Sequence, residues 1–312
     1  MRIWRQRMDM SQEKSVTLGL IVLVIGAVAI GLAAPLVKLS ELGPQAIGFW
    51  RMALAIPAAL LWMAFDRNPP ATDATPHGWK RYVFLALPGL LFACDLAFWH
   101  AGIKITTAAN ATFLANLQPV FVVLGAWLIF GQTITRRFMI AAGLSVAGAA
   151  ILSSANVSIA PERLPGDVLS MMTAIWYAGY ILAVRQARSY ASTGTVIACT
   201  CAVTAPVLLG VTLAFGETLM PPTLADWWPL IGLALGVQII GQGGVAFGLG
   251  RVPAQIASIV ILIQPIVAAL AGWLMFGEAL VGIQFLGAGL VLVGVYLAQR
   301  RARAAASPRS AN

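Results

Sequence analysis

The feature that most constrains this chain is an internal duplication. The dipeptide Gln118-Pro119 recurs as Gln264-Pro265, a shift of 146 positions, and the motif WLIFG ending at Gly131 recurs at the same shift, without a gap, as WLMFG. Similarity at a fixed spacing indicates that one structural unit is used twice. The fold must therefore contain two related halves.

The composition places both halves in a lipid bilayer. Of 312 residues, 60% are hydrophobic and 10% are charged, with a mean hydropathy of +0.86, whereas a soluble domain carries about 25% charged residues. A helix needs about 20 apolar residues to cross the hydrocarbon core, so the chain accommodates ten spans. The net charge of +9 gathers at span ends and suits an anionic membrane surface, and no nucleic-acid partner is expected.

The apolar runs predict an all-α polytopic membrane protein with ten transmembrane helices. We expect these helices at 17–37, 45–65, 81–101, 107–130, 138–152, 167–184, 194–215, 227–250, 253–276 and 282–298. The chain then divides into an N-terminal tail (1–16), a first five-helix repeat (17–154), a connecting loop (155–166), a second repeat (167–299) and a basic C-terminal tail (300–312).

The distribution of lysine and arginine predicts the orientation. If the N-terminus is cytoplasmic, the inner segments contain most of the 20 Lys and Arg residues, and the outer loops hold only Lys38, Lys104 and Arg163. Cytoplasmic segments are rich in positive residues, so both termini are expected in the cytoplasm and segment 155–166 in the periplasm. A repeat with an odd number of spans is inverted in its second copy. Inverted repeats are typical of transporters, with a central site near the membrane midplane.

Each duplicated Gln-Pro step falls about halfway along an expected span. Proline donates no backbone hydrogen bond and clashes with the carbonyl four residues earlier, so Pro119 and Pro265 are predicted to act as kinks or hinges. Freed backbone groups in lipid are tolerated where they face protein or a wet cavity. The fourth and ninth spans are therefore expected to line a central pathway, with Gln118 and Gln264 as polar contacts. The alternative is that the kinks only aid packing.

Asp95 is the only acidic residue well inside an expected span, and Trp99 follows it by one helical turn on the same face. A carboxylate inside the membrane is a functional candidate, here for binding a substrate ammonium group or a coupling proton. Arg51 lies at a similar depth in the second span. A structural ion pair between Arg51 and Asp95 is therefore the alternative.

Aromatic and amide side chains supply the remaining candidates. Trp176, Tyr177 and Tyr180 lie in the sixth span, away from the interfacial belt that usually holds Trp and Tyr. Aromatic walls with a few polar groups are typical of small-molecule sites, although such rings also fill helix-packing cores. Amides likewise bind ligands or join helices, and those predicted to contact substrate are Asn110, Gln118, Gln242, Gln255 and Gln264.

The sequence lacks the signatures of catalysis. It has no phosphate-binding glycine loop, no His/Cys ligand cluster and no nucleophile arranged with a base. Cys94, Cys199 and Cys201 have neither metal-ligand spacing nor a disulfide pattern. We therefore expect no enzyme activity, no metal site and no cofactor.

The duplicated motifs resemble those of the ten-helix EamA-like branch of the drug/metabolite transporter superfamily. Further matches are WRMALA at 50–55 and TTAANA at 106–111, and the likeness covers essentially the whole chain. The resemblance implies that spans one to four and six to nine surround a substrate pathway, with spans five and ten outside it. The aromatic residues make the chain look like the bacterial aromatic amino acid exporter group. In one departure from the superfamily's small multidrug members, which rely on a glutamate in the first span, the first span here contains no acid.

The expected function is export of amino acids, aromatic ones among them, and related small metabolites across a bacterial inner membrane. Export would proceed by alternating access, as uniport or with proton coupling. Other planar metabolites and cationic drugs are alternative substrates, and a membrane enzyme or a passive channel is an alternative class. The expected partners are a small-molecule substrate and the lipid bilayer, with the chain acting as a monomer or homodimer.

Overall fold

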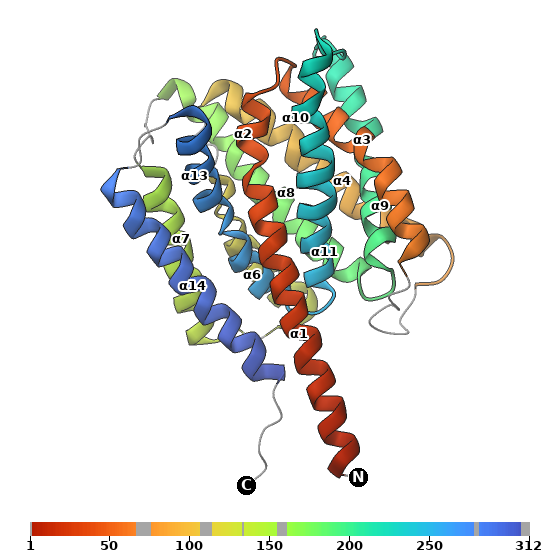
Figure 1. Cartoon of the computed structure of the whole chain (residues 1–312), viewed down its shortest axis with the longest axis vertical. Coiled ribbons are helices and arrows are strands. Elements are labelled where there is room, and N and C mark those ends of the chain that lie inside the picture. Colours follow the sequence, from red (N-terminus) through yellow and green to blue (C-terminus); the bar gives the residue numbers. More distant parts are fainter. Residues whose placement is uncertain are drawn as a thin grey trace.

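The computed structural model describes residues 2–66, 76–106, 114–132, 134–154, 161–277 and 281–306. Within these ranges the chain is helical and contains no strand, which confirms the all-α class, and the long helices stand side by side (Figure 1). The elements in chain order are α1 (Arg2–Gly31), α2 (Ala33–Lys38), α3 (Pro44–Phe65), α4 (Trp79–Ile105), α6 (Gln118–Phe130), α7 (Arg136–Ser154), η1 (Pro161–Arg163), α8 (Leu164–Ala187), α9 (Thr193–Ala214), η2 (Leu224–Asp226), α10 (Trp227–Ile231), η3 (Gly232–Gln242), α11 (Gly243–Leu249), α12 (Ala254–Ile261), α13 (Gln264–Phe276) and α14 (Gly282–Ala306).

These helices correspond to the ten expected membrane spans. Among the described residues, 8 helical segments are long and apolar enough to cross a bilayer. Two shorter apolar helices, Gln118–Phe130 and Phe138–Leu152, occupy the fourth and fifth positions. The expected start of the fourth span, 107–113, lies outside the described residues. The architecture is therefore that of a polytopic membrane protein.

Several boundaries differ from those expected. Helix α1 begins at Arg2, so it continues through the segment expected as an N-terminal tail. Helix α8 begins at Leu164, inside the expected connecting loop, because Pro165 suits the first turn of a helix. The eighth span runs through α10, η3 and α11 without interruption, and η3 is a π-helix, a wider form that is frequent at functional sites.

Helices α6 and α13 are the same element in two repeats. Each has 13 residues, begins at the glutamine of a Gln-Pro step, and is followed by a glycine in the left-handed conformation, Gly131 (φ 60°) or Gly277 (φ 65°). The N–H of each glycine bonds a carbonyl of the last helical turn at 3.1 Å. Glycine adopts this backbone conformation without steric cost. The duplicated sequence thus produces duplicated structure.

The contacts between α7 and α14 show that the repeats are inverted. A Cβ atom built at Gly148 would lie 2.6 Å from the carbonyl oxygen of Gly287, and one built at Gly294 would lie 2.6 Å from that of Ala141. Early residues of one helix therefore face late residues of the other, and the two helices are antiparallel. Since α7 and α14 are the fifth helices of their repeats, the second repeat crosses the molecule in the opposite direction.

Helices α3 and α9 form another close pair, and at each end of the pair a carboxylate that follows one helix accepts hydrogen bonds from the start of the other. Asp66, just after α3, accepts a hydrogen bond from the backbone N–H of Gly194 in the first turn of α9 (2.8 Å). Glu217, just after α9, accepts hydrogen bonds from the backbone N–H groups of Gln45 and Ala46 in the first turn of α3 (2.9 Å each). Helix starts have unpaired N–H groups and a partial positive charge. Equivalent carboxylates of the two repeats therefore stabilise equivalent helix starts.

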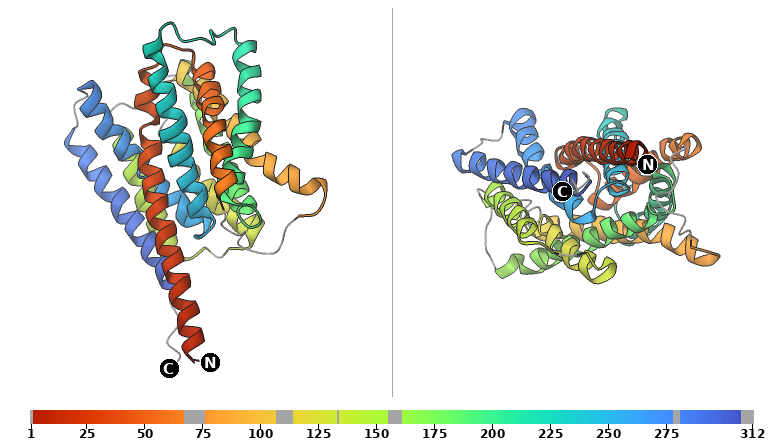
Figure 2. Two further views of the ribbon diagram at one scale, coloured as in Figure 1. Left: turned by 45° about the vertical axis from the view of Figure 1, so that its right-hand side comes forward. Right: turned by 90° about the horizontal axis from the view of Figure 1, so that it is seen from below.

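Helices α1 and α4 pack against helices of the other repeat. Helix α1 crosses η3 and α11, and α4 crosses α8. The backbones approach closely, because a Cβ atom at Gly26 would lie 2.7 Å from the carbonyl oxygen of Gly241, and one at Gly102 would lie 3.1 Å from that of Gly166. Small residues permit such packing in lipid. These crossings enclose the centre, whereas α7 and α14 lie together at one side (Figure 1 and Figure 2).

The two ends of the molecule differ in charge. The start of α1 and the end of α14 lie at the same end (Figure 1). The helix order places Lys80, Arg81, Arg136, Arg185, Arg188 and Arg251 at this end, and Glu41, Glu162, Asp167, Glu217 and Asp226 at the other. Such a distribution is typical when the basic end faces the cytoplasm. The orientation itself stays a prediction.

We expect Gly148→Leu to destabilise the protein, because its side chain would collide with the backbone of α14. Overpacking of this kind typically costs about 1–3 kcal/mol. Gly143→Leu is the matched control on the same helix, since a Cβ atom there has no neighbour within 4 Å. Thermal unfolding in detergent should show a clearly lower melting temperature for Gly148→Leu alone. Equal melting temperatures for the two variants would contradict the packing of α7 on α14.

Candidate functional site

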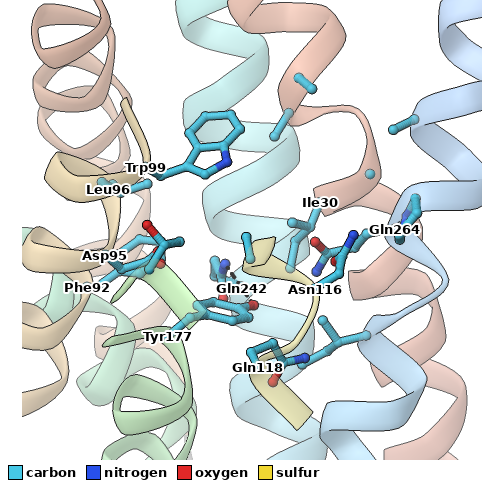
Figure 3. A pocket seen from close by; sticks show the side chains of 18 of the residues that line it. Ile30, Phe92, Asp95, Leu96, Trp99, Asn116, Gln118, Tyr177, Gln242 and Gln264 are labelled. Carbon is cyan, nitrogen blue, oxygen red and sulfur yellow. Dashed lines mark hydrogen bonds between the residues drawn. The ribbon is translucent and has the colours of Figure 1, made fainter. Parts of the chain in front are cut away.

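A pocket of about 140 Å³ lies between the two repeats and is partly open to the outside. The first repeat contributes residues of α1, α2, α3, α4 and the segment that leads into α6, and the second contributes residues of α8, η3, α12 and α13. Figure 3 shows the polar and aromatic side chains that converge on this space.

The Gln-Pro steps form the part of the wall where the repeats meet. Helices α12 and α13 are separated by a short turn, in which the N–H of Ile263 bonds the carbonyl three residues earlier at 3.1 Å. In the fourth span the N–H of Leu117 makes the equivalent bond, to the carbonyl of Leu114, at 3.2 Å. Pro119 and Pro265 thus lie at helix starts, where the missing N–H costs little. Residues beside both breaks line the pocket.

Two opposite charges are buried at the pocket. Arg51 is 7% exposed and Asp95 is 6% exposed. The Nη2 atom of Arg51 donates to Oε1 of Gln238 at 3.1 Å, and the guanidinium lies 5.4 Å from the ring centroid of Phe92, within cation–π range. Among the described residues, Asp95 makes no hydrogen bond and no direct ion pair with Arg51. Both charges therefore remain within reach of a ligand.

Four amide side chains of the pocket have unpaired atoms. Gln118 donates from Nε2 to a backbone carbonyl of α12 (3.1 Å), and Gln242 donates to the hydroxyl of Tyr177 (3.5 Å). Within the described part of the chain, the Oε1 atoms of these two glutamines have no partner, nor do the side-chain amide nitrogens of Asn116 and Gln264. Buried polar groups are normally hydrogen-bonded, so these atoms are suited to a polar ligand or to water.

Aromatic rings form the other walls. Phe92, Trp99 and Tyr177 line the pocket, and in Figure 3 Asp95 lies between Trp99 and Tyr177. Tyr180 is fully buried behind them and stacks on Phe92 (4.6 Å between centroids) and on Tyr177 (5.7 Å). Tyr180 therefore supports the wall without lining it.

Two other residues of the predicted site lie elsewhere in the described structure. Trp176 lies beside Phe98, with 5.9 Å between ring centroids, and is not part of the pocket lining. Gln255 is buried at the start of α12, also outside the lining. Asn110 lies outside the described residues. The predicted residues that the structure brings together are Asp95, Trp99, Gln118, Tyr177, Gln242, Gln264 and Pro265.

The pocket also contains residues that sequence reasoning missed, among them Phe92, Asn116 and Thr173. Phe92 precedes Asp95 by one helical turn, and Thr173 precedes Tyr177 by one turn, so each shares a face with a predicted residue. Helical spacing from the predicted residues would have identified these two. Asn116 lies in the break before α6, where helical spacing does not apply.

We expect a cysteine introduced at position 268 to report on the pocket. In a background without Cys94, Cys199 and Cys201, Ala268→Cys should react with a small water-soluble maleimide roughly tenfold or more faster than Ala257→Cys, because thiol reactivity requires access. Ala268 lines the pocket, whereas Ala257 is fully buried in the same span. Labelling of the two variants, followed by mass spectrometry, measures the ratio. Equal rates would contradict the pocket's accessibility.

Comparisons with known proteins bear on the family and the fold. The model of the EamA-like transporter family matches residues 17–154 and 164–299. An uncharacterized transporter of Archaeoglobus fulgidus is 24% identical over 278 residues, which cover 89% of this chain and 95% of the relative. The pseudopaline exporter CntI of Pseudomonas aeruginosa is 25% identical over 213 residues, which cover 67% of this chain and 72% of that protein.

A solved crystal structure shares the fold, with a TM-score of 0.76 over 94% of this chain and 98% of the other, at 20% identity. At this identity the likeness bears on the fold alone. The family model, by contrast, matches one segment in each half and together these segments make up most of the chain. The chain therefore belongs to the EamA-like transporter family and is a multi-pass membrane transporter.

Proposed function

We propose that this transporter exports amino acids, with a preference for aromatic ones, across a bacterial inner membrane. The observation that carries the proposal is the pocket between the repeats, where aromatic rings stand beside a buried carboxylate and unpaired amides. Trp99 and Tyr177 offer surfaces for ring stacking, and Asp95 offers a partner for an ammonium group. The outward direction is supported by the relative whose name is that of an exporter.

Transport proceeds by alternating access in this proposal, with the inverted repeats rocking around the pocket. In the present conformation Gln118 of the first repeat donates to the backbone carbonyl of Ser258 in the second. This bond joins the repeats on the side of the pocket nearer the chain termini, because α12 begins at that end. Breaking it would open that side, and the helix breaks at Pro119 and Pro265 provide the hinges.

The basic end of the molecule faces the cytoplasm in this proposal, so both termini are cytoplasmic. Substrate then enters from the end that holds the chain termini and leaves from the end where the acidic residues gather. The charge difference between the two ends supports this orientation.

Cationic drugs and other planar metabolites are the second candidate class. The observation that favours them is that Asp95 has no cationic partner bonded to it in the described structure, while the aromatic walls suit any flat ring. A proton carried by Asp95 would then couple transport to the proton gradient. A passive channel, in contrast to either carrier, would show flux that does not saturate.

Purified protein in proteoliposomes should take up labelled phenylalanine and tryptophan saturably and faster than threonine or a cationic dye. Tyr177→Leu should lower this uptake about tenfold, a change of about 1.4 kcal/mol, because it removes a stacking wall and the hydrogen bond from Gln242. Trp176→Leu is the matched control, adjacent in sequence but outside the pocket lining, and it should keep most of the activity.

Each uptake assay is run with and without an imposed proton gradient. Amino acid uptake that is unaffected by the gradient indicates a facilitator, and uptake that depends on it indicates proton coupling. Dye uptake that requires the gradient, with no amino acid flux, would overturn the proposed substrate in favour of the second class. Equal loss of transport in the two variants at equal amounts of folded protein would argue against Tyr177 as a pocket wall.

A further inference from the structure

Arg51 has no part in the function proposed so far, although its burial demands an explanation. A cation inside the membrane normally faces a partner or a cavity. Its contacts are with the neutral side chains of Gln238, at 3.1 Å, and Phe92, at 5.4 Å from the ring centroid. The Nε atom is buried and has no partner among the described residues. Arg51 therefore lines the pocket with its charge uncompensated by direct contact.

Asp95 shows the complementary feature. It lines the same pocket, is 6% exposed, and has no hydrogen-bonded or ion-paired partner in the described part of the chain. Opposite charges buried near each other gain most from a direct, hydrogen-bonded ion pair. Here Gln238 holds the guanidinium from the side of η3 instead. Both charged residues line the same pocket.

We infer that Arg51 binds the carboxylate of a zwitterionic substrate whose ammonium group pairs with Asp95. The inference rests on the proposed function, because it requires that this pocket bind the transported molecule. Guanidinium groups bind carboxylates through parallel N–H donors in a planar fork, and the unpaired Nε of Arg51 belongs to such a fork. Gln238 is a positioning residue that acts through Arg51.

In this arrangement the transporter selects its substrate by the positions of the positive and negative charges on the ligand. A zwitterion supplies one partner for each buried charge. A simple cation satisfies Asp95 but leaves Arg51 unpaired beside a second positive charge, and discrimination by such an unfavourable contact is strong. The pocket therefore selects the amino acid headgroup over an amine with the same side chain.

The rest of the pocket is consistent with a bound headgroup between the charges. The side-chain oxygens of Gln242 and Gln118 are buried and have no partner among the described residues, so they can accept hydrogen bonds from an ammonium group. Gln238 and Gln242 both lie in η3, so one element contacts Arg51 and, through Gln242, the hydroxyl of Tyr177. The aromatic walls then remain for the side chain of the substrate.

The test measures how four ligands raise the melting temperature of the wild-type protein in detergent: phenylalanine, phenylalaninamide, threonine and threoninamide. At a pH well below the α-amino pKa of about 7.7–8.0, each amide keeps the ammonium group and the side chain but replaces the carboxylate with a neutral group. Apparent affinities follow from the concentration dependence of the shift. We expect each amide to bind roughly 10- to 100-fold more weakly than its amino acid, the factor typical of a hydrogen bond to a charged group.

Variants assign this discrimination to Arg51. In Arg51→Gln, phenylalanine should lose affinity roughly 10- to 100-fold while phenylalaninamide changes little, so that the two ligands become equivalent. Arg51→Lys keeps the charge without the fork and should retain part of the discrimination. Asp95→Asn is the matched control, because it should weaken both ligands alike. Loss of discrimination in Asp95→Asn, with its retention in Arg51→Gln, would overturn the assignment.

The ligand series in the wild-type protein decides the matter even if a variant fails to fold. Equal binding of phenylalanine and phenylalaninamide would overturn the role of Arg51 and leave the aromatic preference intact. Discrimination against both amides, with threonine binding as well as phenylalanine, would support the role of Arg51 and overturn the aromatic preference. No response to any of the four ligands would overturn both.

Discussion

In the hydrocarbon core of a membrane, every backbone N–H and C=O group must find its partner within the protein, and chain that is not helical is tolerated only against protein or a wet cavity. In the described structure this requirement controls where the spans are interrupted. The break between α12 and α13 and the turn before α6 both lie at the pocket. At the ends of the pair formed by α3 and α9, Asp66 and Glu217 satisfy the helix starts instead. The pocket thus lies where the helices are broken.

Inversion of the repeats determines what surrounds this pocket. Equivalent helices meet as antiparallel pairs, as α7 and α14 do, and α1 and α4 cross helices of the opposite repeat. Close approach of the backbones depends on glycine at these crossings, because helix association in lipid relies on van der Waals packing. The pocket is therefore lined by residues of both repeats. A movement of one repeat against the other would change the pocket as a whole, which suits a transporter of this family.

The candidate site shows which pocket residues can be predicted from the sequence and which cannot. Tyr177 and Trp176 are neighbours in sequence and equally aromatic, yet Tyr177 lines the pocket and Trp176 packs beside Phe98. A helix rotates by about 100° per residue, and an apolar span in lipid has no polar face to reveal its orientation. The same limit applies to Gln255, which is buried outside the lining. Asp95 could be predicted from the sequence, because an isolated carboxylate inside a membrane span is energetically costly and is therefore a functional candidate.

The sequence by itself determined the membrane environment, the duplicated half, the number of spans and the positions of the Gln-Pro breaks. Each of these follows from a property that can be recognised along the chain: the length of the apolar runs, the repeated motif, and the inability of proline to continue a helix. Only the tertiary structure decided that Arg51 bonds Gln238 and not Asp95, and that Phe92 and Asn116 join the wall. These facts depend on the rotation and crossing of helices from different repeats. Such geometry arises from the close packing of many small residues, and no single stretch of sequence encodes it.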